Sequence, residues 1–176
     1  MKKTFLIFSF GTGILSAQTS TFITDGDWLD ASNWDTGVVV PDNQNALINA
    51  NAIVDRNTGT ANVDNPSRIE IGSGPDASGS VTVTGGTLSG AHGGGNGTFV
   101  GVNGGNGTLR VEEGATYRTQ GATMQLAVAD FSGGTGFVSV AGVLQIYKFL
   151  NVTYGTFDMM PTAKGTLFNS NNASSI

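Results

Sequence analysis

The sequence predicts an all-β fold, namely a right-handed parallel β-helix (β-solenoid) of about 28-residue repeats. The first observation is composition, since 27 of the 176 residues are glycine and only 12% are charged, against about 25% charged in an average domain. Each glycine inside a helix costs roughly 1 kcal/mol relative to alanine, so glycines at this density oppose helices. The second and third observations are a fixed internal period and a strict alternation of apolar and polar residues.

The interior of the chain repeats itself. Three units align over residues 69–88, 98–116 and 125–144, and weaker units surround 46–69 and begin at 154. Shared positions recur at a nearly constant spacing, in one series at Gly86, Gly114 and Gly142 and in another at Val83, Val111 and Val140. A unit this short cannot bury its apolar face alone, so we expect it to stack on its neighbours.

Each unit contains a triplet in which two apolar residues flank a polar one, as in Val81-Thr82-Val83, Leu109-Arg110-Val111 and Val138-Ser139-Val140. This period of two is typical of a half-buried strand. Stacked in register, the strands would pair in parallel about 4.8 Å apart, with glycines at corners that exclude a Cβ. An antiparallel sandwich or barrel also has many short strands, but has no reason to keep the repeat.

Residues 1–17 have the pattern of a secretory signal peptide. Lys2 and Lys3 precede an apolar segment that ends in small residues, and we expect cleavage after Ala17. The apolar segment has about 12 residues, fewer than the roughly 20 that span a bilayer, and no later segment is longer. We therefore expect a secreted or cell-surface (extracytoplasmic) protein without a membrane span.

Charge and cysteine content narrow the range of partners and chemistry. The formal net charge is −5, and it becomes two units more negative without Lys2 and Lys3. Such a surface repels nucleic acid, so no nucleic-acid partner is predicted. The chain has no cysteine, which excludes disulfides, a thiol nucleophile and thiolate metal sites.

The predicted organisation has four parts: a signal peptide at 1–17, an N-terminal cap segment at 18–45, solenoid repeats at 46–160 and a polar C-terminal tail at 161–176. Solenoid ends need caps, and the large rings of Trp28 and Trp34 suit the first coil. Two alternatives remain open for the other end: the chain is a truncated longer protein, or the solenoid ends with Tyr154, Phe157, Met159 and Met160.

The segment Asp27–Asp35 carries a family resemblance, together with Pro41, Ala46–Asn49 and the Ile-Gly, Gly-Ser-Val-Thr-Val and Gly-Gly-Thr-Leu units that follow. It resembles the start of exported β-strand-repeat passenger proteins, which include autotransporter-like adhesin passengers and repeat surface proteins associated with PEP-CTERM sorting. The resemblance covers about residues 25–145. It implies a surface scaffold, on which different proteins carry different functions.

Carboxylates are the first candidates for chemistry. Asp25 and Asp27 would share one strand face and could resemble the paired acids of a glycosidase. They lie beside the predicted cap in an Asp- and Gly-rich segment, where turn formation is the more common role. Glu112 and Glu113 are adjacent and precede Gly114, which favours solvated turn residues.

Metal and phosphate sites lack their required patterns. His92 is the single histidine, whereas a metal site or acid–base pair needs partners. The calcium-binding Gly-Gly-x-Gly-x-Asp pattern, aligned on 104–111 and 133–140, puts Leu109 and Val138 at the aspartate position. Asp76 and Asp130 are isolated loop acids, and the glycine-rich loop at 93–97 lacks the Gly-Lys-Ser/Thr of a phosphate loop. No metal, cofactor or catalytic residue is assigned.

Two further surface patterns involve threonine and aromatic side chains. The Thr82-Val83-Thr84 pair of threonines is replaced by Arg110 and Glu112 in the next unit, so no regular threonine row for ice binding is predicted. Aromatic residues could form an exposed strip for carbohydrate stacking, the candidates being Tyr117, Tyr147, Phe149 and Phe131. Their faces are not determined by the local sequence, so some of them could instead lie in the core.

The leading functional hypothesis is a non-enzymatic, exported structural or adhesive β-solenoid module of a bacterial cell surface. Surface polysaccharide or other surface proteins are its expected partners. The alternative is a secreted carbohydrate-active β-helix, a polysaccharide lyase or glycosidase, that uses Asp25, Asp27 or loop carboxylates. An enzyme should gather acidic and basic side chains in one groove, whereas a scaffold should scatter its acids over turns.

Overall fold

The computed structural model describes residues 18–41, 44–55, 66–92, 97–120, 125–128, 133–147, 149–153, 155–169 and 172–175. Within these ranges the regular elements are strands β1 to β17 and the 3-10 helix η1 at Ala31–Asn33. Threonine, valine and isoleucine recur in the strands, in agreement with the predicted all-β class, because β-branched side chains favour strands.

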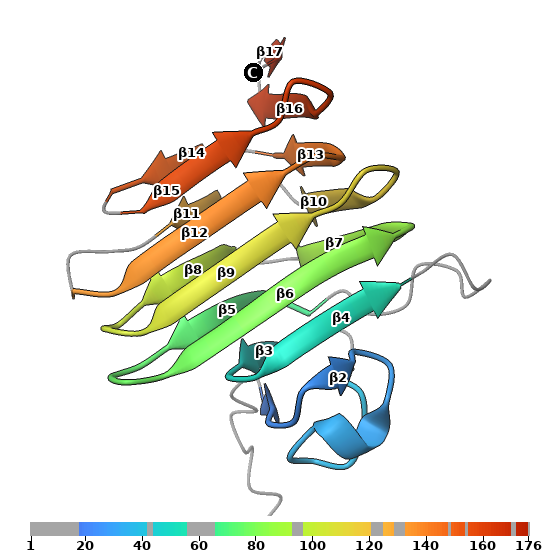
Figure 1. The fold of residues 1–176 in the computed structure, drawn as a ribbon, viewed down its shortest axis with the longest axis vertical. Coiled ribbons are helices and arrows are strands. Elements are labelled where there is room, and N and C mark those ends of the chain that lie inside the picture. The colour runs from blue at the N-terminus through green and yellow to red at the C-terminus, as the bar shows by residue number, and fades with distance from the viewer. Residues whose placement is uncertain are drawn as a thin grey trace, which may run out of the picture.

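The strands form three sheets, A, B and C. Sheet A contains, in order, β1 (Thr19–Phe22), β3 (Asn45–Ile48), β5 (Arg68–Ser73), β8 (Thr98–Val102), β11 (Gln125–Val128) and β14 (Phe149–Val152). Sheet B contains β2 (Gly26–Asp27), β4 (Asn51–Asp55), β6 (Ser78–Gly85), β9 (Asn106–Val111), β12 (Thr135–Val140) and β15 (Thr156–Met159). Sheet C contains β7 (Thr87–His92), β10 (Thr116–Gln120), β13 (Val143–Ile146), β16 (Lys164–Asn169) and β17 (Asn172–Ser175). From β5 to β16 each coil adds one strand to each sheet, which makes the fold a β-solenoid (Figure 1).

The register of the coils is the one that the triplets predict. Val83 pairs with Val111, and Val111 pairs with Val140, both in parallel. Every described pairing between named strands is parallel except that of β16 with β17. The predicted β-solenoid and the length of its repeat are therefore confirmed.

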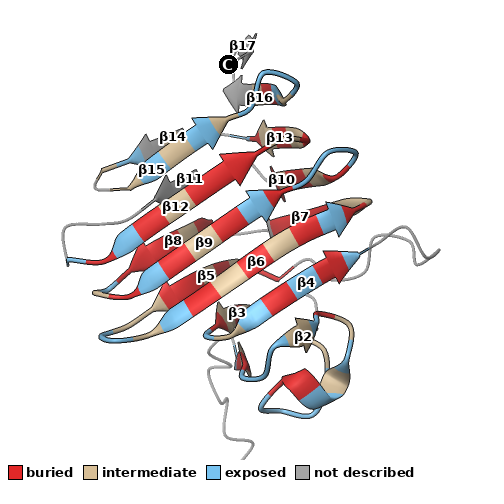
Figure 2. Cartoon of the chain, viewed as in Figure 1, coloured by how far each residue is buried: buried red, intermediate tan, exposed pale blue. Residues whose placement is uncertain are grey.

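The core lies between the three sheets and follows the period of two. In β6 the residues alternate between outward and buried positions, with Val81 and Val83 both fully buried (Figure 2). Leu109, which pairs with Val81, and Val138, which pairs with Leu109 in the next coil, are also fully buried. Full burial of one such side chain contributes about 1.5–3 kcal/mol, so the stacked interior supplies the main driving force of the fold.

Glycines occupy the corner between sheets A and B. Gly72 and Gly101 have φ angles of 59° and 68°, a region that favours glycine. A Cβ on Gly72 would collide with the backbone of Asn106, and one on Gly101 with that of Thr135, both in the next coil. The corner therefore excludes side chains for two separate reasons.

At the corner between sheets B and C, the predicted series of Gly86, Gly114 and Gly142 is wrong at Gly114. Thr116 N donates to the oxygen of Gly86, and Val143 N donates to the oxygen of Ala115. Ala115 thus lies between Gly86 and Gly142 in the stack, because the turn after Val111 is one residue longer than the turn after Val83. Gly114 instead lies on the exposed turn, with a φ angle of 81°.

The sheets extend past both ends of the predicted repeat region 46–160. At the N-terminal end, β1 pairs in parallel with β3, and Trp28 and Trp34 are buried against the same core as β1. At the other end, β16 lies within 161–176 and pairs in parallel with β13. The antiparallel strand β17 then pairs with β16. The candidate end residues Phe157 and Met159 are half-buried and Met160 is exposed, whereas Tyr154 lies outside the described residues.

Candidate functional site

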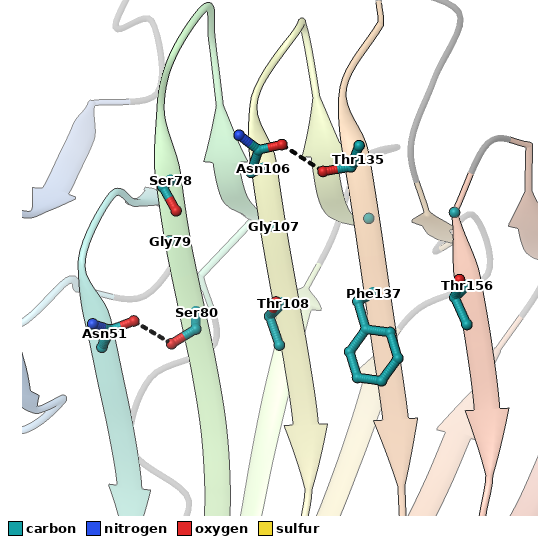
Figure 3. A pocket seen from close by; sticks show the side chains of 12 residues that line it. Asn51, Ser78, Gly79, Ser80, Asn106, Gly107, Thr108, Thr135, Phe137 and Thr156 are labelled. Atoms are coloured by element: carbon teal, nitrogen blue, oxygen red, sulfur yellow. Dashed lines mark hydrogen bonds between the residues drawn. The ribbon is translucent and has the colours of Figure 1, made fainter.

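The outer face of sheet B carries a groove of about 400 Å³. It crosses β4, β6, β9, β12 and β15, so five coils contribute to it (Figure 3). Its lining contains hydroxyl and amide side chains, glycines and one aromatic ring: Asn51, Ser78, Gly79, Ser80, Asn106, Gly107, Thr108, Thr135, Gly136, Phe137, Gly155 and Thr156. None of these side chains is charged.

The groove follows from the alternation within each strand. Because Val81, Leu109 and Val138 point into the core, the residue before each of them points outward. The register joins these outward residues into a central row of Asn51, Ser80, Thr108, Phe137 and Thr156. A parallel corner row consists of Ser78, Asn106 and Thr135.

Hydrogen bonds fix side chains along both rows. Ser80 Oγ donates to Asn51 Oδ1 over 2.8 Å, and Thr135 Oγ1 donates to Asn106 Oδ1. Asn51 in turn donates to Asp25, with its backbone N to Oδ1 at 2.8 Å and its Nδ2 to Oδ2 at 2.9 Å. These bonds run from one coil to the next and hold the side chains in a defined orientation.

The aromatic ring of the central row has a cationic neighbour. The guanidinium carbon of Arg110, on the adjacent strand β9, lies 5.4 Å from the ring centroid of Phe137. The distance is within the range of a cation–π interaction. A similar pair lies on the outer face of sheet A, where the guanidinium carbon of Arg68 is 4.1 Å from the ring centroid of Phe99.

The two candidate catalytic acids have separate structural roles. Asp25 accepts both hydrogen bonds from Asn51, and these bonds lower the pKa of its carboxyl, the backbone bond most of all. Asp27 Oδ1 accepts from the backbone N of Leu29 over 2.8 Å, which forms a local turn. A general acid needs a raised pKa, so Asp25 has the opposite property.

The other candidate polar residues are dispersed. Glu112 and Glu113 are exposed on the turn between β9 and β10, and Asp76 is exposed on the turn between β5 and β6. Asp130, the loop at 93–96 and the side chain of His92 lie outside the described residues. Among the residues with described positions, no three His, Cys, Asp or Glu side chains gather as metal ligands do.

The residues of the calcium and threonine patterns have defined positions in the fold. Leu109 and Val138, at the positions where a calcium repeat needs aspartate, are fully buried in the core. Thr82 pairs with Arg110, and Arg110 pairs with Ser139, so the threonine row is interrupted in the next coil.

Of the candidates for an aromatic strip, Tyr117 lies in the core, where it is fully buried. Its hydroxyl forms a hydrogen bond with Thr98 inside the core, in space left by Gly90, where a Cβ would meet that hydroxyl. Tyr147 is 39% exposed, while Phe131 and the side chain of Phe149 lie outside the described part of the chain. The surface ring that sequence reasoning missed is Phe137, whose outward position follows from the buried Val138 beside it.

The buried hydroxyl of Tyr117 is expected to make the fold less stable at high pH. Burial raises the pKa of its hydroxyl well above the ordinary 10.0, so the folded chain keeps the proton where the unfolded chain loses it. We expect this residue to cost about 1.4 kcal/mol of unfolding free energy for each pH unit above 10. Urea titrations of wild type and Tyr117→Phe at pH 9 to 11 measure the difference. Equal slopes for both proteins would show that the buried hydroxyl does not contribute.

Comparisons with protein-family models, with curated proteins and with solved structures found no match to this chain. The part of the chain that the structure describes contains no helix with the length and hydropathy of a transmembrane segment. Fold and surface chemistry therefore carry the functional inference.

Proposed function

We propose that this chain is a non-enzymatic, exported structural or adhesive module of a bacterial cell surface, related to the β-strand-repeat passenger proteins that its sequence resembles. The observation that carries the proposal is the groove on the outer face of sheet B, where five successive coils contribute uncharged side chains in register, four of them polar and the fifth the aromatic Phe137. Such a groove can make contacts on successive coils, and linked weak contacts give high avidity.

Several features support an exported scaffold, and the roles of two acids favour it over a secreted enzyme. The pattern of residues 1–17 favours export, and the stacked parallel coils supply stability without disulfides. The acids proposed for glycoside chemistry, Asp25 and Asp27, each hold a neighbouring backbone N–H. Surface polysaccharide or another surface protein is the partner that the uncharged groove lining suits.

Expression of the full chain in a bacterial host tests the proposal. We expect an extracytoplasmic protein whose N-terminus is Gln18, because the segment 1–17 is removed on export. Beads coated with this protein should adhere to bacterial cells, whereas albumin-coated beads should not. The protein should release no reducing ends from polysaccharides.

Two results would overturn this assignment. One is a protein that stays in the cytoplasm with the segment 1–17 attached. The other is catalytic release of sugar ends that Asp25→Asn and Asp27→Asn abolish, since that would favour the carbohydrate-active alternative.

A further inference from the structure

We infer that the groove on the outer face of sheet B binds an uncharged polysaccharide chain that runs across the strands. The inference rests on the proposed adhesive function and names the ligand class of that face. It starts from the central row of Asn51, Ser80, Thr108, Phe137 and Thr156 and the corner row of Ser78, Asn106 and Thr135.

The chemistry of the lining suits sugar hydroxyls. Serine and threonine hydroxyls both donate and accept hydrogen bonds, and asparagine offers separate donor and acceptor atoms. A sugar hydroxyl has the same double capacity, so each contact can form in more than one orientation. An acidic polymer is disfavoured because the lining side chains carry no charge, the neighbouring guanidinium of Arg110 already interacts with the ring of Phe137, and the whole chain carries a net charge of −5.

Phe137 provides the apolar contact that a carbohydrate site needs. Its ring is half-buried and lies on the groove side of the sheet, in line with Thr108 and Thr156 (Figure 3). Aromatic rings offer a flat, weakly polar face, which matches the C–H face of a sugar ring. Hydroxyl contacts on both sides of such a ring orient a chain across the strands.

The geometry also favours a polymer over a single sugar. Neighbouring strands lie about 4.8 Å apart, and the central row spans β4, β6, β9, β12 and β15. The Ser80–Asn51 and Thr135–Asn106 hydrogen bonds already fix four of the lining side chains. Side chains that are ordered before binding lose less entropy when a ligand arrives.

Affinity electrophoresis of the exported full chain tests the inference. The gels contain a neutral polysaccharide (dextran, galactomannan or xylan) or the acidic polygalacturonate. We expect at least one neutral polymer to retard the wild type, and Phe137→Ala to weaken that retardation about tenfold. Phe99→Ala is the matched control, because Phe99 is also half-buried beside an arginine but lies on sheet A. It should leave the retardation unchanged.

A second variant guards against a folding defect. Thr108→Arg places bulk and charge in the middle of the groove on a surface position, and it should abolish retardation while the circular dichroism spectrum stays that of the wild type. Each of three results would overturn the inference: equal effects of Phe137→Ala and Phe99→Ala, retardation by the acidic polymer alone, or mobility that depends on protein concentration instead of polymer. The last result would identify a second copy as the occupant.

The bead assay separates the inference from the function on which it rests. If beads coated with Phe137→Ala adhere as well as wild-type beads, the adhesive function stands and the groove is not its polysaccharide site. A second outcome is that neither wild-type nor variant beads adhere, while a neutral polymer still retards the wild type in the gel. In that case the groove assignment stands and the adhesive function is contradicted.

Discussion

Gly101→Ala is expected to lower the free energy of unfolding by more than about 4 kcal/mol, a loss in the range reserved for severe structural defects. Gly101 has a φ angle of 68° and lies near the end of β8, just before the corner that leads to β9. A Cβ there would run into the backbone oxygen of Thr135 and the backbone N of Gly136 in the next coil. Because both obstacles are backbone atoms, relief requires two coils to separate.

Gly37→Ala is the matched control for this prediction. Gly37 has nearly the same φ angle, 67°, but a Cβ on it would meet nothing within 4 Å. Its substitution adds only the cost of a left-handed residue, about 1–2 kcal/mol. Urea denaturation followed by circular dichroism gives both values. If the two variants lose the same stability, backbone strain alone explains these glycines, and close contact between coils does not.

The sequence predicts the register of the strands correctly, but it does not predict which residues occupy the corners. The triplets around Val83, Val111 and Val140 predict the correct pairing, since a shift by one residue would turn the apolar side chains to solvent. The glycine spacing fails at Gly114 because turns between sheets B and C differ in length from coil to coil. When turn lengths vary, the sequence spacing identifies equivalent positions within the strands but not within the turns.

The site residues show a similar division. The burial of Tyr117 could have been predicted from the sequence. Thr116 and Arg118 flank it and suit the outer face, so the alternation within the strand turns Tyr117 inward. The same reasoning on Val138 would have identified Phe137 as a surface ring. The role of Asp25 could not have been predicted from the local sequence, because its partner Asn51 lies 26 residues away and contacts it only when two coils stack.

The N-terminal end of the core contains a cluster of aromatic side chains. Trp28 and Phe22 are fully buried, and Trp34 is nearly so. The ring centroids of Trp28 and Trp34 are 4.9 Å apart at an interplanar angle of 84°, and those of Phe22 and Trp34 are 5.1 Å apart. Trp34 Nε1 also donates to the backbone oxygen of Trp28 over 2.9 Å. We expect this cluster to cover the apolar side chains at the N-terminal end of the stack.

Trp28→Ala should therefore lower the free energy of unfolding by about 3–5 kcal/mol, the usual cost of removing a large buried ring. Ile23→Ala is the local control, because Ile23 is 56% exposed at the same end of the solenoid and should change stability by less than about 0.5 kcal/mol. Urea denaturation measures both changes.

Hydrogen exchange distinguishes a cap from an ordinary core residue. In a solenoid each coil contacts only its neighbours, so loss of a cap should speed exchange first in β3 and β4 and only later in β12. A uniform increase along the stack would mean that the coils unfold as one cooperative unit and that Trp28 acts on the whole core. A loss of stability below about 1 kcal/mol would contradict the cap altogether, because a fully buried tryptophan cannot be removed so cheaply from a packed end.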